Sequence, residues 1–159
     1  MLNKTGVACK QDLDAVFPEE KLLIKPKALI ECYEEIPCNP CSTCCPVNAI
    51  HIEEDINHRP VIDYDVCTGC GICVYHCPAL AISVVSIKED RAYFKIPYEL
   101  HPLPTKGEVW DGVNRAGEVI CEARVEQVAK KDSFDKTALI TVSVDKAYLY
   151  QFITIRKKP

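Results

Sequence analysis

Four cysteines between residues 67 and 78 have a spacing that is typical of iron–sulfur binding. The segment CTGCGICVYHCP reproduces the run C-x2-C-x2-C-x3-C-P. The first three cysteines of such a run bind one [4Fe–4S] cluster, and the fourth binds the other cluster of a two-cluster protein. A zinc site uses C-x2-C pairs and would give the third and fourth cysteines of this run no role. The run therefore predicts a second group of cysteines.

A second and irregular group of cysteines precedes this run, in the segment CYEEIPCNPCSTCCP at residues 32–46. Its last part, Cys41-x3-Cys45-Pro, repeats the end of the regular run. When the two runs are aligned on this part, the position that corresponds to Cys67 is occupied by Glu35. A carboxylate is a hard ligand that suits cluster iron poorly. Cys32 and Cys44 are the two candidates to replace it. Cys32 keeps the step from Cys41 to Cys45, whereas Cys44 would make adjacent residues bind different clusters.

The two runs together predict two ligand sets of four cysteines each. We expect one [4Fe–4S] cluster on Cys32, Cys38, Cys41 and Cys77, and another on Cys45, Cys67, Cys70 and Cys73. In the regular run, Gly69 and Gly71 predict positive φ angles and a close approach of the backbone to the cluster. A Rieske-type role for His76 is not favoured, because Rieske centres replace two cysteines with histidines and this run retains all four.

No catalytic constellation accompanies these ligands. The remaining histidines have no nucleophile or paired carboxylate motif beside them, and the six glycines form neither a P-loop nor a dinucleotide-binding motif. We therefore predict no catalytic residues in this chain and expect a non-catalytic subunit of an oxidoreductase.

The elements that position the cysteines repeat along the chain. The segment PVNAI at residues 46–50 matches PALAI at residues 78–82, and each begins with a proline that can open a short helix. We expect strands at residues 28–32, 50–53, 61–64 and 82–87. These segments predict an α+β fold: a ferredoxin-type, pseudo-twofold domain around two [4Fe–4S] clusters, followed by a small β-rich module.

Changes of composition predict three parts. Residues 1–27 read as an N-terminal arm that packs on a partner or wraps the core, residues 28–100 as the two-[4Fe–4S] ferredoxin domain, and residues 101–159 as a small β-rich partner-contact module. In the last part we expect strands at residues 107–110, 119–128 and 138–144. Asp145 is expected to cap a final short helix that continues through Phe152.

Bulk properties indicate the compartment and the kind of partner. Residues 1–105 carry 9 basic and 15 acidic side chains, and residues 106–159 carry 10 basic and 8 acidic ones. An acidic surface repels nucleic acid and suits a basic patch on a redox partner. The chain has eleven cysteines but no apolar leader, and no apolar run is long enough to span a membrane. We therefore expect a cytoplasmic protein with metal-bound rather than disulfide-bonded cysteines.

One family resemblance extends over most of the chain. The segment IECYEEIPCNPC, the motif CP-x2-AI, the regular run and the cysteine-poor β-rich stretch resemble the ferredoxin-like subunit of multi-subunit flavin-dependent amino-acid dehydrogenases. These dehydrogenases are of the L-proline and hydroxyproline type. The resemblance implies that the eight cysteines named above bind clusters, and that FAD- or FMN-bearing partner subunits oxidise the substrate and pass electrons to this chain. The extra Cys44 departs from the family pattern.

Three classes of function follow from these observations. The first is an electron-transfer subunit of a hetero-oligomer, which receives electrons from a flavin dehydrogenase subunit and passes them to a downstream acceptor. The second is a freely diffusing ferredoxin, which would need little more than the cluster domain. The third is a zinc-binding structural module, which would be colourless. The arm and the terminal module favour the first class, because additional ordered chain commonly covers or forms an interface.

Overall fold

The fold is described by a computed structural model of residues 2–159. Its mixed helix and strand content confirms the predicted α+β class. The helices in this part of the chain are short: the α-helices are α1 (Leu2–Thr5), α2 (Lys10–Val16), α3 (Pro40–Thr43) and α4 (Ile72–His76), and the 3-10 helices are η1 (Glu20–Ile24), η2 (Asp132–Phe134) and η3 (Lys146–Tyr148).

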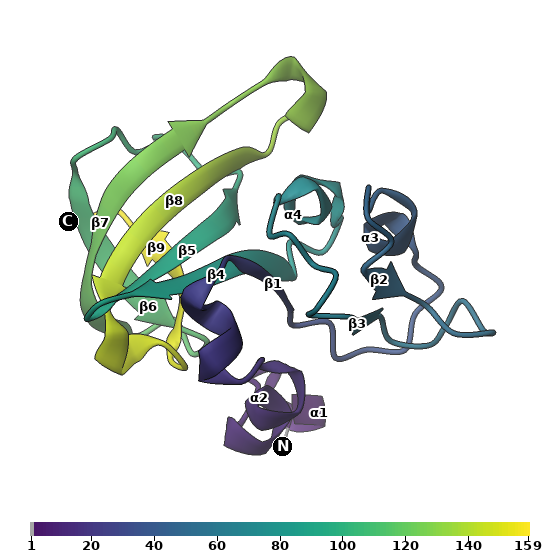
Figure 1. Cartoon of the computed structure of the whole chain (residues 1–159). Coiled ribbons are helices and arrows are strands. Elements are labelled where there is room, and N and C mark those ends of the chain that lie inside the picture. The colour runs from purple at the N-terminus through teal and green to yellow at the C-terminus, as the bar shows by residue number, and fades with distance from the viewer. Residues whose placement is uncertain (1) are drawn as a thin grey trace.

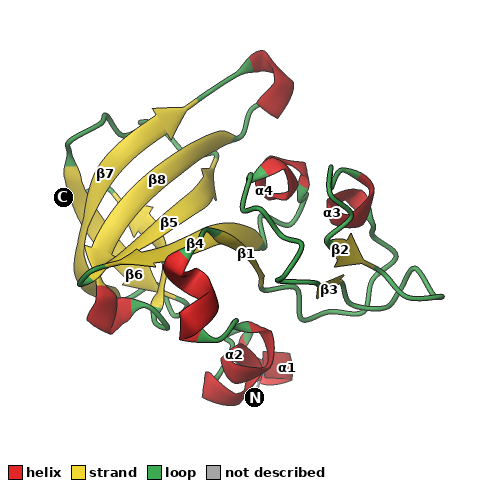
Figure 2. Ribbon diagram, viewed as in Figure 1, coloured by secondary structure: helices red, strands yellow, loops and turns green. Residues whose placement is uncertain are grey.

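Seven strands form one antiparallel sheet that curves around the larger core (Figures 1 and 2). In spatial order the strands are β1 (Lys27–Ile30), β4 (Ile82–Lys88), β5 (Arg91–Tyr98), β8 (Ala138–Asp145), β7 (Val119–Ala129), β6 (Val109–Asn114) and β9 (Phe152–Arg156). A separate antiparallel pair joins β2 (Ile50–His51) to β3 (Val61–Ile62). The two strands of this pair are shorter than the sequence predicts.

Strand β5 shows how the sequence builds the larger core. Its residues are buried in alternation, because successive side chains of a strand point to opposite faces. Ala92, Phe94, Ile96 and Tyr98 point inward. The ring centroids of Phe94 and Phe152 lie 4.7 Å apart, so β9 packs on the same core. Apolar burial on this scale is the main stabilising contribution of the sheet.

The sheet crosses the predicted boundary at residue 100. Strand β5 pairs along its whole length with β8, from the pair Arg91 and Asp145 to the pair Tyr98 and Ala138. The strands predicted in residues 101–159 therefore form near their predicted positions, but they extend a sheet that begins with β1 and β4. Whether residues 28–100 fold without residues 101–159 stays a prediction that truncation can test.

The end of the chain differs from the expectation in one respect. Asp145 does cap a helix, since its Oδ1 accepts a hydrogen bond of 2.8 Å from the backbone N–H of Ala147. The helix is only the 3-10 turn η3, and Phe152 begins β9 instead of ending the helix. The aromatic side chain of Phe152 is fully buried, so pairing with β6 and burial in the core override the helical pattern.

The N-terminal arm wraps the chain's own core over part of its length. Leu23 in η1 is fully buried in the larger core, and η1 packs against β4. The Tyr64 hydroxyl donates a hydrogen bond of 3.0 Å to the carbonyl of Val16. The arm therefore reaches the segment that leads into the regular cysteine run.

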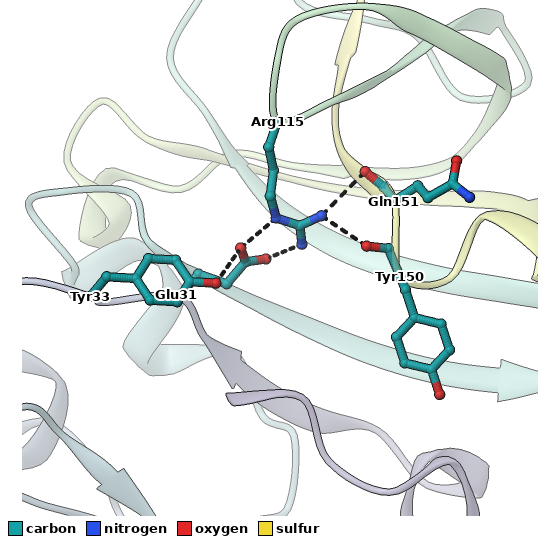
Figure 3. Close-up of polar contacts among 5 residues, drawn as sticks. All are labelled: Glu31, Tyr33, Arg115, Tyr150 and Gln151. Atoms are coloured by element: carbon teal, nitrogen blue, oxygen red, sulfur yellow. Dashed lines mark hydrogen bonds and ion pairs between the residues drawn. The ribbon is translucent and has the colours of Figure 1, made fainter. Parts of the chain in front are cut away.

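A buried ion pair joins the end of β1 to two loops of the sheet (Figure 3). The guanidinium of Arg115 donates to both carboxylate oxygens of Glu31, over 2.5 and 2.7 Å, and the two side chains are 10% and 9% exposed. Arg115 also donates to the carbonyls of Tyr150 and Gln151, and Tyr33 donates to Glu31. A bidentate pair of this kind fixes both position and orientation. It holds the residue before Cys32 against the sheet.

Candidate iron–sulfur sites

The cysteine-bearing segments lie beside one edge of the sheet, on the right of Figure 1. They pack around a second, smaller group of buried residues. Cys41, Cys67 and Cys73 belong to this group, together with apolar side chains from β1, β2, α4 and β4. These three thiols are thus part of the interior, where they pack among apolar side chains.

Four cysteines line one cavity, which we call the first cavity: Cys32, Cys38, Cys41 and Cys77. Cys32 and Cys38 lie in the loop after β1, Cys41 lies in α3, and Cys77 follows α4. Apolar side chains, including Ile30 and Ile82, complete the walls. The predicted set of the irregular run is therefore brought together around one space.

Four other cysteines line a second cavity: Cys45, Cys67, Cys70 and Cys73. Cys45 follows α3, Cys67 and Cys70 lie in the loop before α4, and Cys73 lies in α4. Each cavity thus takes three cysteines from one run and the last cysteine of the other run. This exchange is what the motif predicts.

Cys44, the alternative to Cys32, lines neither cavity. Its side chain is half-buried, and its Sγ donates to the carbonyl of Cys41 over 3.6 Å. Burial raises the pKa of the Cys44 thiol, and the neighbouring thiols of Cys45 and Cys70 raise it further. The geometry favours Cys32 over Cys44, and the ligand assignment itself stays a prediction.

The backbone supports the two exchanged cysteines in the same way. The N–H of Ala49 donates to the sulfur of Cys45 over 3.2 Å, and the N–H of Ala81 donates to the sulfur of Cys77 over 3.4 Å. Each turn contains a residue with positive φ, 51° at Asn48 and 53° at Leu80. Hydrogen bonds to sulfur stabilise the thiolate and influence cluster potentials. The repeated C-P-x-x-A motif is the sequence signal for these donors, which sequence reasoning missed.

Two glycines shape the loop of the regular run as predicted. Gly69 and Gly71 have φ angles of +67° and +84°. A Cβ atom added to Gly69 would lie 2.4 Å from the carbonyl oxygen of Pro26, a distance that no side chain tolerates. The loop can therefore approach the chain before β1 only with glycine at this position.

A buried lysine supports the same loop. Lys27 at the start of β1 is 8% exposed, and its Nζ donates to the carbonyls of Tyr64 and Cys67 over 2.5 and 2.8 Å. The N–H of the next residue, Ala28, lies 3.5 Å from the sulfur of Cys67 and donates to it. Sequence reasoning missed Lys27, because nothing local marks a lysine whose partners lie 37 and 40 positions away.

Burial changes the acidity of one thiol in each cavity. Burial raises the pKa of the Cys73 thiol to about 12 and that of the Cys41 thiol to about 11, and neighbouring cysteines add to both effects. Without metal these groups hold their protons, and iron binding displaces the protons. Soft sulfur ligands, backbone N–H donors and apolar walls suit an iron–sulfur cluster.

The remaining candidate residues lie outside the two sets. His76 lines neither cavity, and its ring packs 4.7 Å from the ring of Tyr75. His58 lines the first cavity with an exposed side chain. Cys9 is the N-cap residue before α2, and Cys121 lies in β7. In residues 2–159 no three His, Cys, Asp or Glu side chains lie close enough together to bind a single metal ion.

Comparison with known families identifies one of the two cysteine runs. Residues 60–83 match the family model of the 4Fe–4S binding domain, so the match contains Cys67, Cys70, Cys73 and Cys77. The irregular run lies outside the matched residues. No solved structure gives a significant match to the chain. Within the described residues, no helix has the length and apolar character needed to cross a membrane.

Several curated proteins are similar to part of the chain. The ferredoxin-type protein NapF of Haemophilus influenzae is 36% identical over 58 residues, which are 35% of this chain and 33% of that protein. Pyruvate synthase subunit PorD is 44% identical over 56 residues in Methanocaldococcus jannaschii and 43% over 49 residues in Methanothermobacter marburgensis. The first match covers 35% of this chain and 60% of the relative, and the second covers 31% and 53%.

The chain therefore spans between one third and three fifths of the length of these relatives. The family match covers the regular cysteine run, and electron transfer is the function typical of such a domain. This protein contains a ferredoxin-type 4Fe–4S binding domain.

Proposed function

We propose that this chain is an electron-transfer subunit that binds two [4Fe–4S] clusters, one in each cavity. The observation that carries the proposal is the sorting of eight cysteines into two cavities of four, with one cysteine exchanged between the runs. When bound, each cluster accepts and donates one electron at a time. The chain's own residues hold the clusters, exclude water from the buried thiols and set the reduction potentials.

A pseudo-twofold arrangement of the cysteine-bearing part is included in this proposal. Two antiparallel strand pairs support it, since β1 pairs with β4 and β2 pairs with β3. The matching N–H to sulfur bonds at Cys45 and Cys77 support it as well. Helices α3 and α4 lie side by side in Figure 1 and are in contact. Cys41 of α3 lines the first cavity and Cys73 of α4 lines the second, so the two cavities are neighbours. Neighbouring cavities suit the passage of an electron from one cluster to the other.

Each cavity is lined by one apolar side chain that is partly exposed to solvent. Ile36 lines the first cavity and is 42% exposed, and Val47 lines the second cavity and is 37% exposed. Cys70 is itself exposed. A relay needs one face for the electron donor and another for the acceptor. These exposed residues would give each cavity a face of its own. The net negative charge of residues 1–105 favours partners with basic docking surfaces.

For the partner, we propose a flavin-bearing amino-acid dehydrogenase of the proline or hydroxyproline type, on the basis of the sequence resemblance. Single electrons would pass from its reduced flavin to this chain and on to a downstream acceptor. A hetero-oligomer also agrees with the names of several relatives, which are subunits of pyruvate synthase and of sulfite dehydrogenase. Residues 101–159 would then contact the partner. The cytoplasmic location stays a prediction.

Anaerobic purification of the tagged chain, expressed together with its neighbouring genes, tests this proposal. We expect a brown protein with about eight irons per chain, and flavin-containing polypeptides that remain bound to it. Proline or hydroxyproline should then reduce the clusters, and pyruvate serves as the control substrate. A brown protein that purifies alone supports a diffusible ferredoxin instead. A colourless protein that contains zinc contradicts both redox functions.

A further inference from the structure

Lys27 places a buried positive charge beside one of the two cavities only. We propose that this ammonium raises the reduction potential of the cluster in the second cavity, so that electrons pass from the first cavity to the second. The inference rests on the proposed two-cluster function and adds a direction to it. Lys27 is a positioning residue that acts through the loop of Cys67.

The contacts of Lys27 fix its charge close to the cysteine loop. Its Nζ donates to the carbonyls of Tyr64 and Cys67. The ammonium therefore contacts the backbone of Cys67, which is a predicted cluster ligand. The N–H of Ala28 donates to the sulfur of the same cysteine. Positive charge and hydrogen bonds at the sulfur both favour the reduced form of a cluster, because reduction adds one negative charge.

No carboxylate cancels this charge at close range. Among the described residues, no Asp or Glu oxygen lies within 4.0 Å of the Lys27 Nζ. Asp63 and Asp65 flank Tyr64, but both are exposed to solvent, where water and salt screen their charges. A buried charge is screened much less, so the field of Lys27 at the second cavity is not offset.

Among the described residues that line the first cavity there is no lysine or arginine. The charge of Arg59 does reach the thiol of Cys32, but from an exposed side chain. His58 is among the lining residues. The His58 side chain is 47% exposed and lies 3.9 Å from Glu53, and Arg59 is exposed as well. The asymmetry between the cavities therefore lies in the charge of Lys27, which contacts the backbone of Cys67, because backbone N–H groups donate to sulfurs of both cavities.

A second lysine near the loop differs from Lys27 in its burial. The side chain of Lys95 on β5 covers Gly71, where an added Cβ would lie 3.0 Å from its Cδ. Lys95 is partly exposed, so solvent screens its charge and we expect it to influence the potential less. Lys25 is fully on the surface two residues before Lys27, and it provides the matched control for the loss of one positive charge.

The test is an EPR-monitored redox titration of the purified chain with dithionite, which requires no partner or substrate. The variants are Lys27→Met, Lys27→Gln, Lys27→Arg, Lys95→Met and Lys25→Met. Cys67→Ser identifies which of the two reduction steps belongs to the second cavity, because that step is lost or altered. Iron content and thermal unfolding are measured on every sample.

We expect Lys27→Met and Lys27→Gln to lower the reduction potential of the second-cavity cluster. The expected change is about tenfold in the equilibrium constant for reduction, which is about 59 mV for a one-electron couple. The step of the first cavity should stay unchanged. Lys27→Arg should keep the wild-type potential, Lys95→Met should shift it less, and Lys25→Met should leave it unchanged.

Three results would overturn the inference. In the first, Lys27→Met and Lys27→Gln assemble both clusters without a shift. In the second, Lys27→Arg shifts the potential as much as the neutral variants do, so that packing and not charge is responsible. In the third, neither neutral variant assembles the second cluster, so that Lys27 serves assembly. A wild-type chain without two reduction steps contradicts the proposed two-cluster function itself.

Discussion

The large sheet and the cysteine-bearing segments are held together by different kinds of interaction. Strands of the sheet reach eleven residues, and their inward side chains form a continuous apolar core. The segments from α3 to α4 contain helices of four and five residues and strands of two residues. Elements this short bury too little surface to be stable alone. The comparison teaches that the sheet is stabilised by its own side chains, and we expect the cysteine-bearing part to depend much more on bound metal.

Truncation after Leu103 should have the largest effect. It removes β8, which pairs with all of β5, and it removes Phe152 from its contact with Phe94. An unpaired apolar strand is a site of aggregation. We therefore expect the shortened chain to aggregate and to lose its iron, as measured by sedimentation and iron analysis.

Removal of residues 157–159 alone is the control for this truncation, because these residues are exposed and belong to no strand. We expect this chain to keep its iron and not to aggregate. If the chain that ends at Leu103 also stays free of aggregates and keeps both clusters, residues 28–100 are a domain in their own right and the sheet is not needed as a whole.

Iron removal should destabilise the cysteine-bearing part more than the sheet. Chelation under reducing conditions leaves the thiols of Cys41 and Cys73 buried and protonated, with pKa values raised by burial. We expect residues 31–81 to lose protection from hydrogen exchange while β5, β7 and β8 keep theirs. Hydrogen exchange followed by mass spectrometry measures both in one sample. Equal loss of protection in the sheet would show that the regions fold as one unit.

Two cysteine variants sharpen the comparison within the cysteine-bearing part. Cys32→Ser should lose one cluster, about half of the iron, or convert it to a three-iron form, because Cys32 lines the first cavity. Cys44→Ser is the matched variant and should keep both clusters, since Cys44 lines neither cavity. Iron content and the EPR spectrum measure these effects. The opposite pattern would assign Cys44 as the ligand.

The ion pair between the regions should give the smallest of the four effects. Arg115→Met leaves the carboxylate of Glu31 buried without its partner, and we expect a loss of roughly 3 kcal/mol in the free energy of unfolding. Adding Glu31→Gln should recover part of the loss. Urea unfolding followed by the fluorescence of Trp110 measures both.

Lys158→Met is the control for the ion pair, because the pair of Lys158 with Glu122 is exposed. We expect this variant to unfold like the wild type. If Arg115→Met does the same, the ion pair does not hold the segment before Cys32, and the two regions are coupled by their other contacts, such as those of α4 with β5 and β8.

The sequence predicts the local part of the site well. The spacing of the regular run predicts the loop, and Gly69 and Gly71 have the predicted positive φ angles. The sequence does not predict contacts between distant segments. Lys27 meets Cys67 only because β1 docks beside the loop, and Glu31 meets Arg115 across 84 positions of the chain. Such contacts follow from the order of strands in the sheet, which no local pattern encodes.

The exchange of the last cysteines has a consequence for how the protein is made. Cys32 and Cys77 line the same cavity but stand 45 residues apart in the chain. At the usual speed of synthesis, a ribosome needs about 2 to 9 s to make a segment of this length. During that interval the first cavity has no fourth cysteine, and β1 has no β4 to pair with. On the proposed two-cluster function, insertion of a cluster into the first cavity would follow the synthesis of both runs, and the nascent thiols of the first run would depend on a reducing environment until then.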